Sequence, residues 1–217
     1  MLRGLGDLVG ARDQFEQALS VFETALGPDH PEVGGIRNEI AHVLWARWDL
    51  QGARAQLERA LVIEEATYGP GHPRVATVRS NLGSVLQDLG DLAGARNELE
   101  RAVALFEAAL DLDHPEVATA RTKLGVVLRD LGDLQGARAE LERALAIVDK
   151  ISAPGYPNVA IISGYLGGVL RDLGALAEAR TQLEQSLALH ETVLEPDHPY
   201  VVTLRSNLKE VLRELGA

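Results

Sequence analysis

The chain lacks cysteine, contains one methionine, and has aromatic residues at only 4% of its 217 positions. The absence of cysteine excludes a disulfide framework and a thiolate metal site. The interior must therefore be built mainly from Leu, Ala and Val, which suit the close packing of helices. The sequence also lacks an apolar run of the ~20 residues needed to cross a bilayer, and it lacks an N-terminal signal segment. We therefore expect an intracellular, cytoplasmic protein.

An excess of positive charge is also missing, because 32 acidic residues outnumber 21 basic ones and give a net charge of −11. Binding to a nucleic-acid backbone needs a net cationic face. Attraction to an anionic membrane surface has the same requirement. The charge balance therefore argues against both nucleic acid and membrane as partners.

What the chain does have is a strict 42-residue repeat, a signal to be read before any local pattern. A His-Pro dipeptide, with Tyr in place of His once, marks each repeat without insertion or deletion. A second marker, Leu-Gly-Asp-Leu or a variant of it, keeps the same step. We expect residues 1–217 to form a single array, itself a piece of a longer one, with joints at His30-Pro31, His72-Pro73, His114-Pro115, Tyr156-Pro157 and His198-Pro199.

Each repeat is predicted to contain two helices. Helix A runs from Pro73 to Gly90 in one repeat, because its apolar residues fall on one stripe of a helix with 3.6 residues per turn. Proline is tolerated in a first turn, and glycine suits a helix end. Helix B follows from about Asp91 to Leu110, and the short Gly-Asp link makes the two helices antiparallel neighbours.

The starts of the A helices carry two further signals. Asp29 with Glu32, and likewise Asp113 with Glu116, have the spacing of a capping box. The repeated histidines are predicted to be helix-start residues whose ring bonds the loop backbone. Stacked repeats would place them ~10 Å apart, whereas ligands of a shared metal ion lie ~2 Å from it. We therefore predict no metal site.

A single hairpin cannot bury the apolar stripes of both helices, so each hairpin must stack on the next. The predicted fold is all-α, a right-handed superhelical solenoid of antiparallel helix pairs with about ten helices. Function is then expected on the surface that the repeats share.

The residues within one repeat resemble a known family. Leu82-Gly83, Leu86, Ala95, Leu99 and Ala102 match the spacing of the tetratricopeptide signature, in which small residues let two helices approach closely. The 42-residue unit, the long helix B and the Gly27–Pro31 joint resemble the kinesin light chain subtype. At the position of the signature tryptophan, four repeats have an arginine, an amphipathic side chain that can lie along the core edge. These are Arg37, Arg79, Arg121 and Arg205, and the remaining repeat has Ser163.

The resemblance implies a protein or peptide partner, bound on the concave face formed by the A helices. The helical wheel independently places a polar face opposite the core stripe. The predicted peptide-binding groove consists of Arg37, Asn38, His42, Trp45, Thr77, Ser80, Asn81, Ser84, Gln87, Lys123, Arg129, Tyr165, Arg171, Asn207 and Arg213. Its arginines are suited to fork onto peptide carboxylates; the alternative is a solvated face with internal ion pairs.

Two repeats depart from the pattern. One contains both tryptophans, Trp45 on the groove side and Trp48 in place of the usual link glycine. Tryptophan is enriched at interface hot spots, whereas the alternative is that Trp45 packs on a neighbour and Trp48 covers the turn. His42 lies one turn before Trp45 and is expected to share its face.

The other irregular repeat has Ile161, Ile162 and Tyr165 among three helical glycines. It predicts either a close approach by a peptide backbone or local loosening with a shallow pocket, since each such glycine costs about 0.5–1 kcal/mol relative to Ala.

Three functions remain open from the sequence. The first is a protein-interaction module, the second a ligand-sensing array within a larger bacterial nucleotide-switch regulator, and the third a self-assembling structural unit. Self-association is suggested because the chain starts and stops within an A helix and exposes apolar residues of the last one. No Ser-His-Asp arrangement or phosphate-binding loop stands out, so we predict no enzyme activity and no cofactor.

Overall fold

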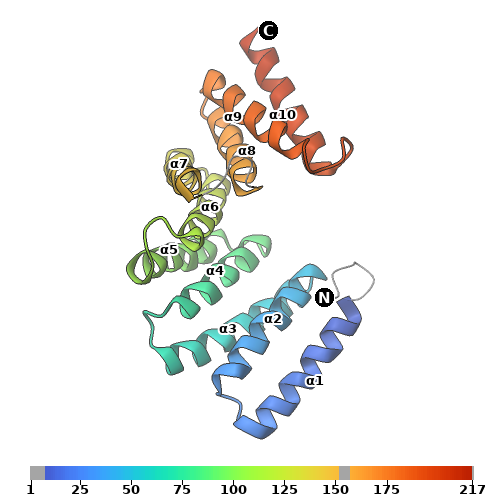
Figure 1. Cartoon of the computed structure of the whole chain (residues 1–217), viewed down its shortest axis with the longest axis vertical. Helices are drawn as coiled ribbons and strands as arrows, with labels where there is room; N and C mark the ends of the chain where they lie inside the picture. The colour runs from blue at the N-terminus through green and yellow to red at the C-terminus, as the bar shows by residue number, and fades with distance from the viewer. Residues whose placement is uncertain (1–7, 152–156, 217) are drawn as a thin grey trace. The chain divides into compact units, whose positions relative to one another are not determined.

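The computed structural model describes residues 8–151 and 157–216, and every regular element in those residues is an α-helix (Figure 1). The prediction of an all-α repeat fold is confirmed. The A helices are the even-numbered ones, and their starts are 42 residues apart. The elements are α1 (Leu8–Leu26), α2 (Pro31–Ala46), α3 (Leu50–Tyr68), α4 (Pro73–Asp88), α5 (Leu92–Ala109), α6 (Pro115–Asp130), α7 (Leu134–Ile151), α8 (Pro157–Asp172), α9 (Leu176–His190) and α10 (Pro199–Leu215).

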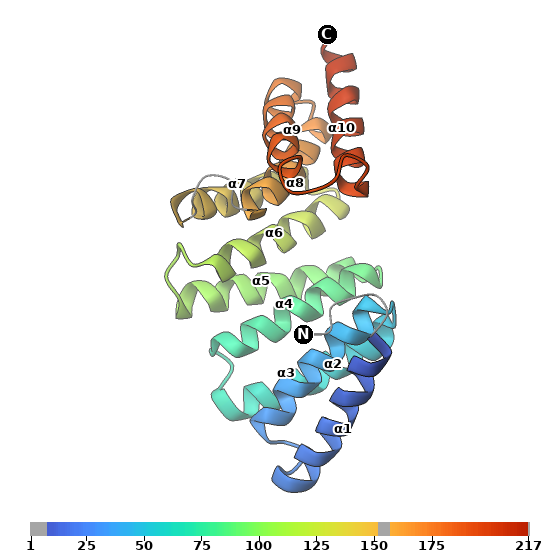
Figure 2. The same cartoon turned by 45° about the vertical axis from the view of Figure 1, so that its right-hand side comes forward.

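The helices belong to two compact units, Met1–Leu110 with α1 to α5 and Asp111–Ala217 with α6 to α10. Each unit is built from antiparallel pairs in which an A helix packs on the B helix that follows it. These pairs are α2 with α3 and α4 with α5 in the first unit, and α6 with α7 and α8 with α9 in the second (Figure 2). That residues 1–217 act as a single array remains a prediction.

Histidine caps the A helices. The Nδ1 atom of His30 accepts a hydrogen bond from the backbone N–H of Glu32 at 3.2 Å. The rings of His72, His114 and His198 each accept the equivalent bond from the N–H of the residue two positions later in the chain. Each ring satisfies one orphan N–H of the helix start, so the structural role predicted for the histidines is confirmed. The joint at Tyr156 lies outside the described residues.

The predicted capping boxes are wrong. His30 is the N-cap of α2, so Asp29 lies one residue too early to cap it, and Glu32 occupies the second helical position instead of the third. The same shift applies to Asp113 and Glu116, because His114 is the N-cap of α6. The proline that follows each histidine fixes where the helix begins.

Aspartate caps three of the B helices. Asp91 accepts from the N–H of Gly94 at 2.9 Å, and Asp49 and Asp133 make the equivalent bonds. A Cβ atom on Gly94 would lie 2.5 Å from the Asp91 carboxylate. Glycine is therefore required by the cap itself. In α9 the N-cap is Ala175, which has no side-chain cap.

The close approach between helices A and B depends on a second glycine. A Cβ atom on Gly83 would lie 2.6 Å from Cγ of the fully buried Leu99, and Gly125 and Gly167 have the same relation to Leu141 and Leu183. Each leucine contributes about 1.5–3 kcal/mol by leaving water. The predicted role of small residues in letting the two helices approach is confirmed.

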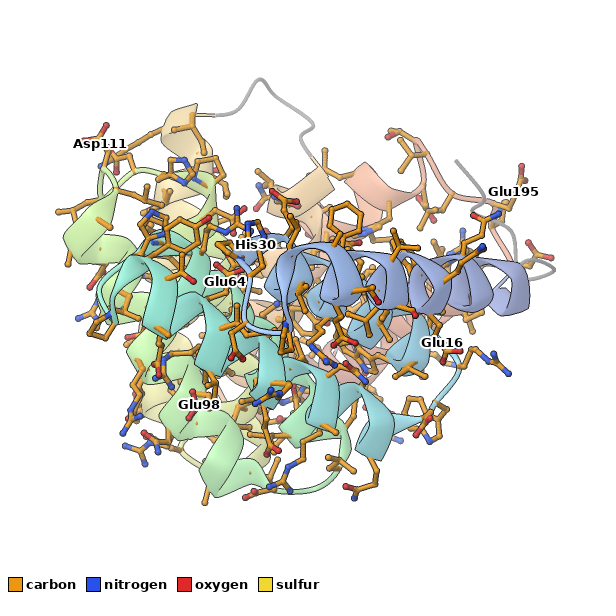
Figure 3. All side chains as sticks on the ribbon, turned by 90° about the horizontal axis from the view of Figure 1, so that it is seen from below. Glu16, His30, Glu64, Glu98, Asp111 and Glu195 are labelled. Carbon is orange, nitrogen blue, oxygen red and sulfur yellow. The ribbon has the colours of Figure 1, made fainter. Side chains whose placement is uncertain are left out.

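One repeat replaces a core residue by a charge. Glu64 on α3 is 2% exposed and receives two hydrogen bonds from Arg74 on α4, at 2.9 and 3.2 Å (Glu64 is labelled in Figure 3). The equivalent positions one and two repeats later hold Phe106 and Val148. Gly34 makes room for this carboxylate, because a Cβ atom there would lie 3.0 Å from Glu64 Oε1.

Candidate functional site

The A helices of the first unit share a polar surface at the contact of α2 and α4. The amide of Asn81 donates to Asn38 Oδ1 at 3.0 Å and lies 3.2 Å from Nε2 of His42. The rings of His42 and Trp45 are 6.3 Å apart, which confirms that they share a face. Four predicted groove residues are therefore brought together on two neighbouring helices.

The side chain of Trp45 is fixed at its polar end. Its Nε1 donates to the carboxylate of Asp88, at the last residue of α4. An indole presents a large apolar ring and a single N–H donor. Trp45 thus links two A helices while part of its ring remains exposed.

Four other predicted groove residues of this unit have different surroundings. The structure corrects the placement of Arg37, because its guanidinium pairs with Glu23 on α1 and Gln56 on α3, among the B helices. Ser80 and Ser84 are buried, and the Ser84 hydroxyl donates to the backbone oxygen of Ser80 at 3.1 Å. Exposed Thr77 donates to the backbone oxygen of Pro73.

Gln87 is half-buried on α4. A helical wheel separates polar from apolar faces, but it does not reveal which polar residues a neighbouring helix covers.

The A helices of the second unit carry charged residues that pair with one another. Arg129 on α6 bonds Asp172 on α8 at 2.8 Å. Arg171 donates to Asn207 at 3.0 Å and to Glu210 at 2.9 Å, both on α10. The alternative of internal ion pairs describes this cluster. Arg213 is exposed on α10.

A cavity of about 230 Å³ lies on the same side of the second unit, between α6 and α8. Its lining is mainly apolar and includes Ile161, which is 37% exposed, and Ile162. The predicted groove residues Lys123 and Tyr165 both line it. Sequence reasoning missed Val148 and Asn158, because Val148 comes from a B helix and the first turn of α8 had no distinguishing pattern.

Burial lowers the pKa of the Lys123 ammonium, and the nearby carboxylate of Glu116 partly offsets this. A charged amine loses hydration in such surroundings. The cavity therefore combines an apolar wall, a phenol and an amine, a combination suited to holding one apolar side chain and fixing its polar neighbours.

Side chains of the protein itself fill the space beside the helical glycines of α8. A Cβ atom on Gly164 would lie 2.6 Å from the hydroxyl of Tyr200, and one on Gly168 would lie 3.1 Å from the guanidinium of Arg129. Gly167 accommodates Leu183, as described for its equivalents. The expected approach of a peptide backbone at these glycines is therefore not available; the shallow pocket is at Ile161 and Tyr165.

Tyr200 belongs to a closed polar cluster between α8, α9 and α10. Its ring lies 4.6 Å from that of His190, and Ser186 donates to the backbone oxygen of Ala160 at 2.7 Å. Burial raises the pKa of Tyr200 to about 12, with a further contribution from Tyr165 and an opposing one from the hydrogen bond with Ser186. Ser186 is fully buried, so this Ser-His pair cannot act on a substrate.

Trp48 has the opposite surroundings to Trp45. It is 70% exposed and has a φ of +64°, the sole positive φ of a non-glycine residue in the described part of the chain. The equivalent residues Gly90, Gly132, Gly174 and Gly216 all have positive φ as well. A bulky side chain in this conformation costs about 1–2 kcal/mol.

The last A helix, α10, exposes apolar residues as expected. Val202 is 52% exposed, Leu208 and Leu212 are half-buried, and Val211 is fully buried. At the position that Gly83 occupies on α4, however, α10 has Lys209. Another helix stacking on α10 in the register of the repeats would meet this lysine instead of a glycine.

The described residues contain no cluster of three or more His, Asp or Glu side chains arranged to hold a metal ion. None of the helices described combines the length and the apolar character needed to cross a membrane.

Two sequence-family models match the chain, and both are described as tetratricopeptide repeat. One matches residues 32–108, 74–150 and 158–217, and the other matches residues 1–32. No curated protein sequence matches the chain.

Solved structures share the fold. A putative kinesin light chain protein of nearly identical TPR-like repeats from Podosopora anserina is 24% identical, covers 86% of this chain and 89% of its own, and has a TM-score of 0.73. Its Q17M form is 24% identical, covers 86% of this chain and 88% of its own, and has a TM-score of 0.74. BtubC (BKLC) from P. vanneervenii is 17% identical over 97% of this chain and 83% of its own, with a TM-score of 0.79. The fold is thus that of kinesin light chain-like repeat proteins.

Proposed function

The chain belongs to the tetratricopeptide repeat family, and we propose that it is a protein-interaction module that holds a peptide or a helix of a partner protein against the A helices of its repeats. Repeats of this family generally mediate interactions between proteins. The proposal extends this to a particular face of the molecule and assigns it no catalytic step and no cofactor. It places the protein in the cytoplasm.

The observation that carries the proposal is the cavity of about 230 Å³ between α6 and α8. Its apolar wall can take one aliphatic or aromatic side chain, and removing such a side chain from water contributes about 1.5–3 kcal/mol. Tyr165 and Asn158 at this cavity offer hydrogen bonds to the backbone on either side of that anchor. Specific pockets of this kind supply most of the energy of many interfaces.

The first unit supports the proposal in a second way. Asn38, His42 and Trp45 follow one another along α2, and His42 is exposed while the other two are partly so. Amide, imidazole and indole groups can exchange their present hydrogen bonds, to Asn81 and Asp88, for bonds to a peptide backbone. A partner lying on this face would therefore find donors, acceptors and an aromatic ring.

The test is an affinity pull-down with the intact chain and an Ile161→Glu variant. The substitution places a charge at the mouth of the cavity, and we expect partners that use it to be recovered at least tenfold less. Val193→Glu is the matched control, because Val193 is 69% exposed in the turn after α9 and does not line the cavity. Equal recovery of every partner by both variants would contradict the proposed site.

A further inference from the structure

An arginine on the A helix bonds an acceptor on a B helix in four repeats, and in two of them it bridges two successive B helices. Arg37 on α2 donates to Gln56, 19 residues later, at 2.7 Å and pairs with Glu23, 14 residues earlier. Arg79 makes the same two contacts, with Glu98 and Glu65 (Glu98 is labelled in Figure 3). These side chains are only 14% and 11% exposed. The planar guanidinium suits the arrangement, because its fork reaches two acceptors at once.

In the second unit, α6 and α10 also carry the arginine, and each arginine bonds one acceptor at one of these two offsets. Arg121 on α6 bonds Glu140, 19 residues later. Arg205 on α10 bonds Glu191, 14 residues earlier, at 2.5 Å. The acceptors on the B helices thus stand at fixed offsets from the arginine.

Helix α8 lacks this arginine. Ser163 occupies the position, while Asp149 stands 14 residues earlier on α7 and Gln182 stands 19 residues later on α9. Carboxylate and amide are the same pair of acceptors that Arg37 has in Glu23 and Gln56. The acceptors have therefore been retained where the donor has been lost.

The loss leaves buried polar atoms without partners. Ser163 is fully buried, and neither its Oγ nor the Oε1 of Gln182, also buried, has a hydrogen-bond partner among the described residues. A buried polar atom in this condition costs free energy of its own. A ligand that donates a hydrogen bond to Gln182 would remove its share of that cost.

A cavity of about 350 Å³ lies at this place, lined by α7, α8 and α9. Asp149 and Gln182 both line it, and Leu166 and Leu170 provide an apolar wall. The volume lies within the ~300–1,000 Å³ of small-molecule sites. Ser163 itself does not line the cavity, but the two acceptors at the arginine's fixed offsets do.

The charges around the cavity favour a cation. Glu142 and Glu178 also line it, but both are already paired with Arg138, at 2.7 and 2.8 Å. No described residue forms an ion pair with Asp149, which is exposed. Glu142 and Glu178 are about half exposed, at 49% and 58%, so the site can be reached from solvent.

We propose that this cavity binds a guanidinium group from outside the chain, either the arginine side chain of a partner polypeptide or a small free guanidine. The group takes the place of the arginine found on the other A helices and donates to Asp149 and Gln182. This site lies among the B helices and is independent of the A-helix face described above. A lysine would fill it poorly, because an ammonium is a point charge and lacks the planar fork.

Calorimetric titration of the intact protein with methylguanidinium tests the proposal. We expect saturable binding with a dissociation constant on the order of 1–10 mM, as befits so small a ligand. Methylammonium is expected to bind at least tenfold more weakly. Equal binding of the two cations would overturn the proposal, because it would indicate general attraction to an acidic surface.

Variants distinguish this site from others. Ser163→Arg restores the arginine of the other repeats, and we expect it to fill the cavity and weaken methylguanidinium binding at least tenfold. Asp149→Asn is expected to weaken binding to a similar extent, whereas Asp197→Asn, which removes the same charge from an exposed loop, is not. Unchanged binding by both Ser163→Arg and Asp149→Asn would overturn the proposal. If Ser163→Arg fails to fold, Asp149→Asn and Gln182→Leu decide the outcome.

The source of the guanidinium follows from a parallel titration. A short peptide with one arginine, compared with the same peptide carrying lysine, is expected to bind at least as tightly as methylguanidinium if the natural ligand is a polypeptide. If the arginine peptide does not bind while methylguanidinium does, the site is assigned to a free guanidine. Failure of both probes to bind would overturn the proposal.

Discussion

The indole N–H of Trp45 donates to Asp88 on the next A helix, and Arg129 makes the equivalent bond to Asp172 two repeats further along. An indole and a guanidinium therefore serve the same link between neighbouring A helices. The sequence offered two explanations for Trp45, partner recognition and packing on a neighbour. The link explains the indole nitrogen and leaves the ring available to a partner.

Trp45→Ala should lower the free energy of unfolding by about 1–2 kcal/mol, because it removes a hydrogen bond to a charged group. Trp45→Arg should cost less than about 0.5 kcal/mol, because arginine restores the link as at Arg129. Urea denaturation of the two variants measures the difference. A pull-down with Trp45→Arg then isolates the ring: loss of a partner from this stable variant would assign recognition to the indole. If Trp45→Arg is as destabilised as Trp45→Ala, the two links are not equivalent.

Trp48→Gly should raise the stability of the chain by about 1 kcal/mol, because glycine adopts a positive φ without the steric cost that a bulky side chain carries. The exposed ring has little packing to lose. The reverse change, Gly90→Ala, should destabilise by a similar amount and serves as the control. A decrease in stability on Trp48→Gly, seen by thermal or urea unfolding, would mean that the ring covers the turn after all.

Arg74→Ala should lower the free energy of unfolding by about 2 kcal/mol, because it leaves the buried carboxylate of Glu64 without its partner. The loss is smaller than the ~3–5 kcal/mol of fully buried pairs, because Arg74 is 47% exposed. Adding Glu64→Val together with Gly34→Ala should recover most of the loss. That pair copies Val148 and Ala118, which occupy the same two positions two repeats later. Urea unfolding of the single and triple variants provides the measurement, and no recovery would show that the site cannot close around an apolar side chain.

Stability should fall as the pH rises from about 10 to about 12, because the pKa of Tyr200 is raised to about 12 in the folded chain. An unfolded tyrosine releases its proton near pH 10. Between these values the folded chain holds a proton that the unfolded chain has lost, so increasing pH favours unfolding. Tyr200→Phe should flatten this part of the stability profile. Identical profiles for the intact chain and Tyr200→Phe would contradict the assignment.

The order and type of the helices could be read from the sequence, because both depend on local rules. The 42-residue step and the proline of each first turn predict where α2, α4, α6 and α10 begin, and the glycine after the helix predicts where α4, α6 and α10 end. The capping histidines were predictable for the same reason, since a cap contacts a backbone group two residues away. The capping boxes failed because a one-residue shift of the N-cap is enough to move every partner.

The candidate sites depended on the tertiary structure. Glu23 decides that Arg37 turns toward the B helices, and Tyr200 fills the space at Gly164; these partners lie 14 and 36 positions away. The sequence by itself determined that Ser163 breaks the row of arginines. Only the packing of α7, α8 and α9 decided that the acceptors at the fixed offsets, Asp149 and Gln182, line a cavity. A helix pattern specifies which face is apolar but not which atoms meet across the interface.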